Sequence, residues 1–168
     1  MTAMTRLHVP VPLRWSDLDA YQHVNNVAML RLLEDARITA FWRHPEAALG
    51  EEWPTAILDT GPHAESHTLV AAQHIEYLKP LGFSRNPVRV EMWIGKVGGA
   101  SLEVCYEVHD GAPGGFARTG PASGAAAYVR ATTTIVVIDA ASGRPRRITD
   151  DERAAWAQFA EEPIAFRR

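Results

Sequence analysis

The sequence predicts an α+β fold in which a curved, antiparallel, five-stranded sheet wraps around one long central helix, with a short helix near the C-terminus. Three observations support this: several segments alternate apolar and polar residues, one segment (VAMLRLLEDARITAFW) has the apolar spacing of a helix, and a helix-capping pattern begins at Thr149. A chain of 168 residues that is 46% hydrophobic is expected to form a single domain, residues 1–168, with one core.

The first strand is predicted from residues 6–15, RLHVPVPLRW, where apolar and polar residues alternate strictly. One face carries Leu7, Val9, Val11, Leu13 and Trp15. Because Pro10 and Pro12 have no N–H to donate to a ladder, this strand is expected to have an unpaired edge or to pair only in part.

The long helix follows, and its apolar residues cover roughly two-thirds of its circumference, more than a surface helix usually shows. A sheet curved around this helix would cover such a surface and would leave its own edges in need of a partner. Glu34 and Arg37 lie three residues apart on the helix. We interpret them as a charge pair that fixes the helix, rather than reading Glu34 as a catalytic carboxylate.

Four further strands are predicted from alternation, followed by the second helix. The strands are expected at residues 67–77, 88–97, 102–108 and 127–138, with a hairpin turn at GKVGGAS, a long flexible hairpin loop over residues 110–124, and the C-terminal helix at 149–160. Thr149 and Glu152 have the spacing of a capping box for that last helix.

Composition and charge exclude several classes of function. A net charge of −3 gives no basic field for nucleic acid or anionic lipid, and the single Cys105 cannot form an intrachain disulfide. We find no leader peptide and no membrane-spanning run, so a cytoplasmic protein is expected. No nucleotide loop, nucleophile elbow or paired-cysteine motif is present, and no cofactor is predicted.

The segment DLDAYQHVNN, residues 17–26, places many polar groups directly before the long helix. Asn25 or Asn26 can cap this helix, and the first N–H groups beyond the cap have no acceptor within it. These free donors can hold an oxyanion or polarise a carbonyl. Asp19, one short loop upstream, could attack such a carbonyl or activate a water beside it.

Simpler roles compete for the other residues of this segment. Asp17 is expected to pair with Arg14, and His23 to orient the loop through backbone carbonyls rather than to act as a base. His63 and His67 have metal-ligand spacing only in a helix, and their Gly-Pro context indicates a loop. A metal site is therefore not predicted.

The stretch RWSDLDAYQHVNNVAMLRLLEDAR, residues 14–37, resembles the signature of hotdog-fold acyl-CoA thioesterases of the hydroxybenzoyl-CoA thioesterase type. In that family an Asp, a His-x-Asn-Asn turn and a Glu-x-Ala-Arg helix segment follow in this order. HIEYLKPL, residues 74–81, resembles the family's next strand, whose end carries a Tyr, a basic residue and a Pro.

The resemblance implies that Asp19 is the catalytic carboxylate, as nucleophile or general base, and that the Asn26 amide polarises the thioester carbonyl. It also implies that His23 and Asn25 shape the site, that Glu34 and Arg37 match the helix pair, and that the substrate is an acyl-CoA. The family's active unit is at least a dimer joined edge to edge, so a homodimer or homotetramer is expected.

This chain departs from the family pattern at several places. Met29 stands where the family often has an aromatic residue, which implies a differently shaped acyl pocket. The connections 45–66 and 110–124 and the tail beyond Asp139 are longer than usual. A non-catalytic acyl-CoA binding or sensing domain and a hydratase on the same fold remain alternatives.

Overall fold

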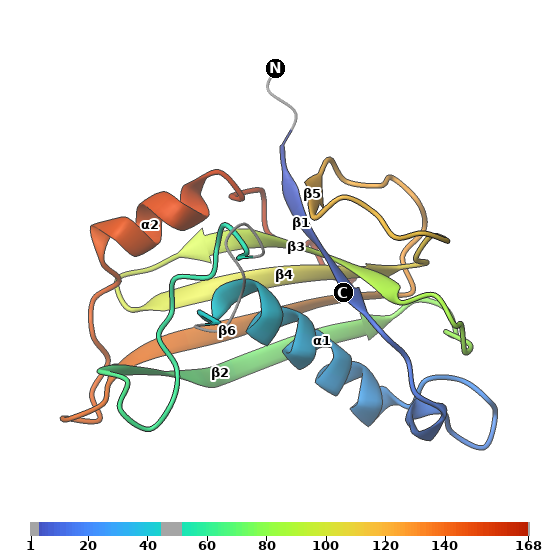
Figure 1. Ribbon diagram of the computed structural model, residues 1–168, viewed down its shortest axis with the longest axis horizontal. Coiled ribbons are helices and arrows are strands. Elements are labelled where there is room, and N and C mark those ends of the chain that lie inside the picture. The colour runs from blue at the N-terminus through green and yellow to red at the C-terminus, as the bar shows by residue number, and fades with distance from the viewer. Residues whose placement is uncertain (1–3, 45–51, 168) are drawn as a thin grey trace.

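The computed structural model describes residues 4–44 and 52–167 as an antiparallel sheet with a long helix across one face and a shorter helix at its edge (Figure 1). The elements are β1 (Arg6–Val11), a 3-10 turn η1 (Trp15–Asp17), α1 (Asn26–Phe41), β2 (Ser66–Tyr77), β3 (Val88–Val97), β4 (Ser101–His109), β5 (Thr119–Gly120), β6 (Val129–Asp139) and α2 (Asp150–Ala157). The strand order is β2-β6-β4-β3-β1-β5, which confirms the α+β class.

Over residues 4–44 and 52–167 the sheet has six strands, so the prediction of five was wrong by one. The additional strand, β5, lies inside the predicted loop 110–124, where Thr119 and Gly120 pair with Leu7 and Arg6 of β1. A strand of two residues shows no alternation, and the Gly and Pro residues around it favour a loop assignment. Residues 45–51 of the other long connection lie outside the described part of the chain.

The first strand ends at Val11, earlier than predicted. Leu13 remains buried, but Trp15 begins η1, is 73% exposed and stacks on Phe83 with ring centroids 4.1 Å apart. Val11 pairs with Val88, the first residue of β3, so the strand has no partner beyond this point, and Trp15 leaves the core face.

One side of α1 packs on the sheet. Its buried residues are Met29, Leu32, Leu33, Ala36, Arg37, Ala40 and Phe41. Val27 is 70% exposed, so within one chain the sheet does not enclose the helix as the wide apolar arc predicted. The width of the apolar arc shows how many helix positions are apolar. It does not show which of them are buried by residues of the same chain. None of the described helices has the length and apolar character to cross a bilayer.

Both α-helices begin where the capping signals predict. Asn25 caps α1, and Thr149 and Glu152 form the predicted capping box of α2.

The chain then continues past α2 over the sheet, where Trp93 Nε1 donates to the Glu162 carbonyl and Phe166 stacks on His74. This tail reaches β2 at the far edge of the sheet.

Candidate active site

A pocket of about 390 Å³ opens at the N-terminus of α1. The loop before the helix and its first turns contribute Asp19, His23, Asn26 and Met29 to its wall. The structure thus brings together four of the five predicted site residues, while Asn25 acts beside the pocket as the helix cap.

The first turn of α1 leaves a donor free. Asn25 has an extended backbone (φ −61°, ψ 145°), and its Oδ1 accepts the Val27 N–H at 2.8 Å, while its carbonyl accepts the Met29 N–H. No acceptor among the described residues pairs with the Asn26 N–H. This N–H and the positive end of the helix dipole can stabilise an oxyanion at the pocket wall.

Asp19 is held by its own turn. Its Oδ1 accepts the N–H groups of Tyr21 at 2.8 Å and His23 at 3.2 Å, and its N–H donates to the His23 carbonyl at 2.8 Å. Gln22 takes up a left-handed backbone conformation (φ +62°) to close this turn. One carboxylate oxygen is thereby fixed, and Oδ2 has no hydrogen bond within the described residues.

Asp17 has the structural role that the sequence favoured, in a different form. Its Oδ2 accepts the backbone N–H of Arg14 at 2.7 Å, and its carbonyl accepts the N–H of Asn25 at 2.8 Å. Asp17 therefore pairs with the main chain of Arg14 rather than with its guanidinium, and it ties the loop before α1 to the start of η1.

The opposite wall of the pocket comes from residues 77–81, which sequence reasoning did not place in the site. The Tyr77 hydroxyl donates to the Asn26 carbonyl at 3.0 Å, and the Lys79 ammonium lies 4.1 Å from the centre of the Tyr128 ring. Tyr77 is separated from Asn26 by 51 positions in the chain. The only sequence signal for residues 77–81 was the motif resemblance of HIEYLKPL.

The predicted contact between Glu34 and Arg37 on α1 is present, but its distance is long for an ion pair. Arg37 Nη2 lies 3.9 Å from Glu34 Oε1, and the Glu34 side chain is 55% exposed whereas that of Arg37 is 10% exposed. Arg37 also donates to the Tyr106 hydroxyl at 3.3 Å. The hydrogen bond from Arg37 to Tyr106 ties α1 to β4, and neither Glu34 nor Arg37 lines the pocket of Asp19.

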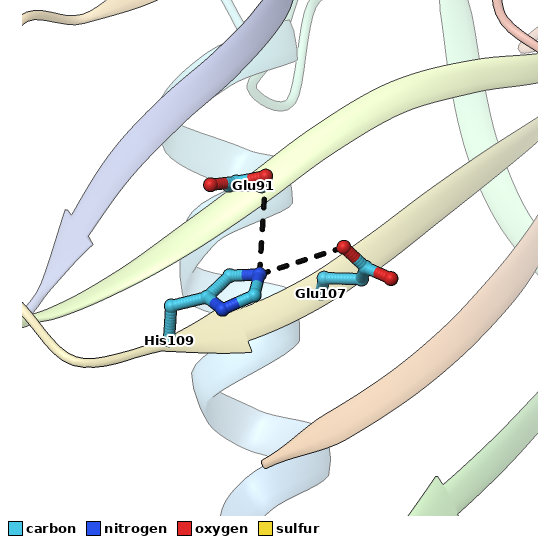
Figure 2. A group of neighbouring side chains, drawn as sticks. All are labelled: Glu91, Glu107 and His109. Carbon is cyan, nitrogen blue, oxygen red and sulfur yellow. Dashed lines mark ion pairs between the residues drawn. The ribbon is translucent and has the colours of Figure 1, made fainter. Parts of the chain in front are cut away.

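One group of side chains in the described residues has metal-ligand atoms close together: Glu91, Glu107 and His109, on the face of the sheet away from α1 (Figure 2). His109 Nε2 lies 3.5 Å from Glu107 Oε2 and 3.8 Å from Glu91 Oε2, in ion-pair contacts that lack hydrogen-bond geometry. Arg6 Nη1 donates to both of these oxygens, at 2.9 and 3.2 Å.

Because a guanidinium already bridges the two carboxylates, we interpret the cluster as a buried ion-pair network. Burial opposes ionisation of Glu107, but the contacts with His109 and Arg6 outweigh it and lower its pKa to about 2. His63 and His67 form no comparable group, because His67 belongs to strand β2.

Comparisons with known proteins agree on one family. A family model described as the thioesterase-like superfamily matches residues 13–156. The chain is similar in structure to the PA2801 protein of Pseudomonas aeruginosa, provisionally named a thioesterase (TM-score 0.65, 27% identity, covering 89% of this chain and 98% of that one). It is also similar to a Thermus thermophilus thioesterase complexed with coenzyme A and zinc (TM-score 0.59, 26% identity, covering 89% of this chain and 95% of that one).

A predicted thioesterase from Bacillus stearothermophilus shares the fold at 18% identity (TM-score 0.66, covering 95% of this chain and 99% of that one). No curated protein sequence matches the chain. These matches confirm the resemblance to hotdog-fold thioesterases, while the narrower hydroxybenzoyl-CoA type stays a prediction.

Proposed function

This chain belongs to the thioesterase-like superfamily, and we propose that it hydrolyses acyl-CoA thioesters to a free acid and coenzyme A. The observation that carries the proposal is a carboxylate and an unpaired N–H, those of Asp19 and Asn26, in the wall of one pocket. Acyl transfer needs this combination, since attack at the carbonyl carbon places negative charge on the carbonyl oxygen.

In the proposed mechanism the thioester oxygen accepts the N–H of Asn26, and Asp19 uses its free Oδ2. As a general base, Oδ2 takes a proton from a water whose oxygen attacks the carbonyl carbon. As a nucleophile, Oδ2 attacks directly, and water then cleaves the resulting anhydride. In both routes the C–S bond breaks, the thiolate of coenzyme A leaves, and the carboxylic acid is released.

The remaining predicted residues shape this site. The Asn25 cap fixes the first turn of α1, whose first residue, Asn26, lines the pocket. His23 supplies both the N–H bound by Asp19 and the carbonyl that accepts the Asp19 N–H. Met29, only 2% exposed yet part of the pocket wall, would contact the acyl group.

An acyl-CoA is the proposed substrate rather than a simple ester. One structural relative, at 26% identity, is described as a thioesterase in complex with coenzyme A. The thiol of coenzyme A is a good leaving group. This chemistry therefore does not demand a strong general acid.

The active form is proposed to be a homodimer, or a homotetramer built from dimers, joined along β2. This strand ends the sheet, and among the described strands it pairs only with β6. Leu69 and Val70 on β2 and Val27 on α1 are 56%, 48% and 70% exposed. A second sheet edge laid against β2 would pair its free backbone groups and cover these apolar side chains.

The proposal is tested by measuring thiol release from a panel of aliphatic and aromatic acyl-CoA esters. Turnover well above the uncatalysed rate with at least one ester is expected. The second candidate, a non-catalytic acyl-CoA binding domain on the same fold, is favoured instead if calorimetry shows tight binding of the same esters without hydrolysis.

A further inference from the structure

Two segments far apart in the sequence, residues 23–26 and 77–82, lie side by side at the pocket, and three contacts join them. The Val24 N–H donates to the Leu81 carbonyl at 2.8 Å, and His23 forms a β-bridge with Gly82. The third contact is the hydrogen bond from the Tyr77 hydroxyl to the Asn26 carbonyl, at 3.0 Å. The first two are main-chain contacts that almost any sequence could make. Of these three contacts, only the one from Tyr77 uses a side chain.

Tyr77 stands at a position suited to this contact. It is the last residue of β2, it pairs in register with Val129 of β6, and both residues line the pocket. The strand therefore holds the Tyr77 backbone, and the side chain reaches from the sheet to the first residue of α1.

We propose that Tyr77 is a positioning residue of this active site, which acts by fixing the orientation of the Asn26 N–H through the Asn26 carbonyl. The inference rests on the proposed function, since it assigns a role toward the oxyanion donor of that mechanism.

The reason lies in the geometry of residue 26. Its N–H and its carbonyl belong to two successive peptide planes that share one Cα, so only two soft dihedral angles separate their directions. The residues on the N-terminal side of a helix lack the full set of helical hydrogen bonds and fray readily. A second hydrogen bond to the Asn26 carbonyl restricts that motion and keeps the N–H directed into the pocket. Preorganised donors of this kind stabilise a transition state more than a bound substrate.

Tyr77 can keep this role over the working range of pH. Burial raises the pKa of its phenol above the ordinary value of 10, so the hydroxyl remains protonated and able to donate. The side chain is 49% exposed, and its oxygen is already committed to Asn26. A separate role as proton donor to the leaving thiolate would need the same hydrogen.

The variant Tyr77→Phe removes the hydroxyl alone. Tyr128→Phe is the matched control, because the Tyr128 hydroxyl also donates one hydrogen bond, to Asp110 at 2.9 Å, while its ring contact with Lys79 survives in Phe. With one acyl-CoA substrate, Tyr77→Phe is expected to lower kcat by about 2- to 10-fold, as loss of one hydrogen bond would. KM should stay within about 2-fold, because ground-state contacts are untouched, and Tyr128→Phe should match the wild type.

A double-mutant cycle tests whether the effect passes through the Asn26 amide. Asn26→Pro deletes that N–H, so adding Tyr77→Phe to this variant is expected to change kcat by less than about 1.5-fold. A general loosening of the fold would instead lower kcat by the same factor in both backgrounds. An additive loss, a Tyr77→Phe enzyme as fast as the wild type, or a change in the shape of its pH–rate profile would each overturn the proposal.

A binding measurement separates this inference from the proposed function. A non-hydrolysable ketone analogue of acyl-CoA carries the carbonyl oxygen without a cleavable bond. Its binding should shift the Asn26 amide proton resonance downfield, and the shift should be smaller in Tyr77→Phe. A wild type that hydrolyses no ester refutes the function alone. Equal shifts in the two proteins refute the role of Tyr77, whatever the activity.

Discussion

Replacing Asn26 by proline removes one N–H and leaves the rest of the helix start intact. Proline is favoured at the first helical position, where the N–H has no partner within the helix. The preceding residue must be extended, and Asn25 already has φ −61° and ψ 145°. The Asn25 cap to the Val27 N–H and the Tyr77 bond to the Asn26 carbonyl both survive.

The expected loss follows from the role proposed for this N–H. Removing one oxyanion donor in acyl-transfer sites costs about 2.7 to 4 kcal/mol, or roughly 10²- to 10³-fold in kcat. Asn26→Ala keeps the N–H and should lose far less. Asp150→Pro, at the first position of α2 behind the Thr149 cap, controls for the effect of proline on stability.

The assay is thiol release under saturating acyl-CoA, with melting temperatures measured in parallel. We expect Asn26→Pro to melt close to the wild type and to turn over at least 100-fold more slowly. Comparable kcat values for the proline and alanine variants would refute the assignment of this N–H as the oxyanion donor. A large drop in melting temperature for Asn26→Pro, without one for Asp150→Pro, would show that the helix start depends on this N–H in another way.

Four further predictions follow from the packing and the charges. Asn25→Ala should lower the free energy of unfolding by about 0.5 to 2 kcal/mol through loss of the cap, measured by urea denaturation against Asn25→Asp, which keeps an acceptor. The depressed pKa of Glu107 contributes stability that is fully present above about pH 4.5 and is lost as pH falls toward 2. The unfolding free energy of the wild type should therefore fall more steeply over that range than that of Glu107→Gln, and equal slopes would show that this carboxylate is not held ionised by its partners. Burial raises the pKa of Cys105 to about 11, so a disulfide reagent should label this thiol only in denaturant, and rapid labelling of the native protein would contradict its burial. Val70→Lys on the exposed edge of β2 should shift the protein toward monomer in light scattering, and an unchanged mass would place the subunit contact elsewhere.

Local signals in the sequence were enough for the helices and most strands. Alternation marks the core positions of β3 and β4 because each strand has one apolar face toward α1. The N-caps at Asn25 and Thr149 follow from side chains that bond to N–H groups two or three residues away. Such contacts depend on neighbours in the chain, and the sequence shows those directly.

The parts that sequence reasoning missed depend on residues far apart in the chain. Trp15 continues the alternation of β1, yet it leaves the core because the partner strand β3 begins opposite Val11 and Phe83 offers a surface partner. Arg6 and Glu107 read as solvated positions on the polar face of their strands. Arg6 is buried and Glu107 is half-buried, because residues near 120 and the tail cover that face: Ser123 N–H donates to Glu91, and Glu161 binds Arg6.

The candidate site shows the same difference between contacts of chain neighbours and contacts of distant residues. Asp19, His23 and Asn26 lie within eight residues, so a loop followed by a helix was enough to predict that they meet. Tyr77 and Lys79 enter the pocket only through the pairing of β2 with β6 and the packing of α1 on the sheet. No periodic pattern in the sequence indicates that contact. The motif HIEYLKPL suggested that these residues matter, but not that they lie beside Asn26.

The most direct test of the account compares wild type with Asp19→Asn in single-turnover hydrolysis of an acyl-CoA ester, with binding of a non-hydrolysable analogue measured alongside. The amide side chain keeps an oxygen for the Tyr21 and His23 N–H groups but removes the nucleophile or base. We predict unchanged binding and a rate reduced by several orders of magnitude. An Asp19→Asn enzyme that binds the analogue and hydrolyses the ester at the wild-type rate would contradict the central claim.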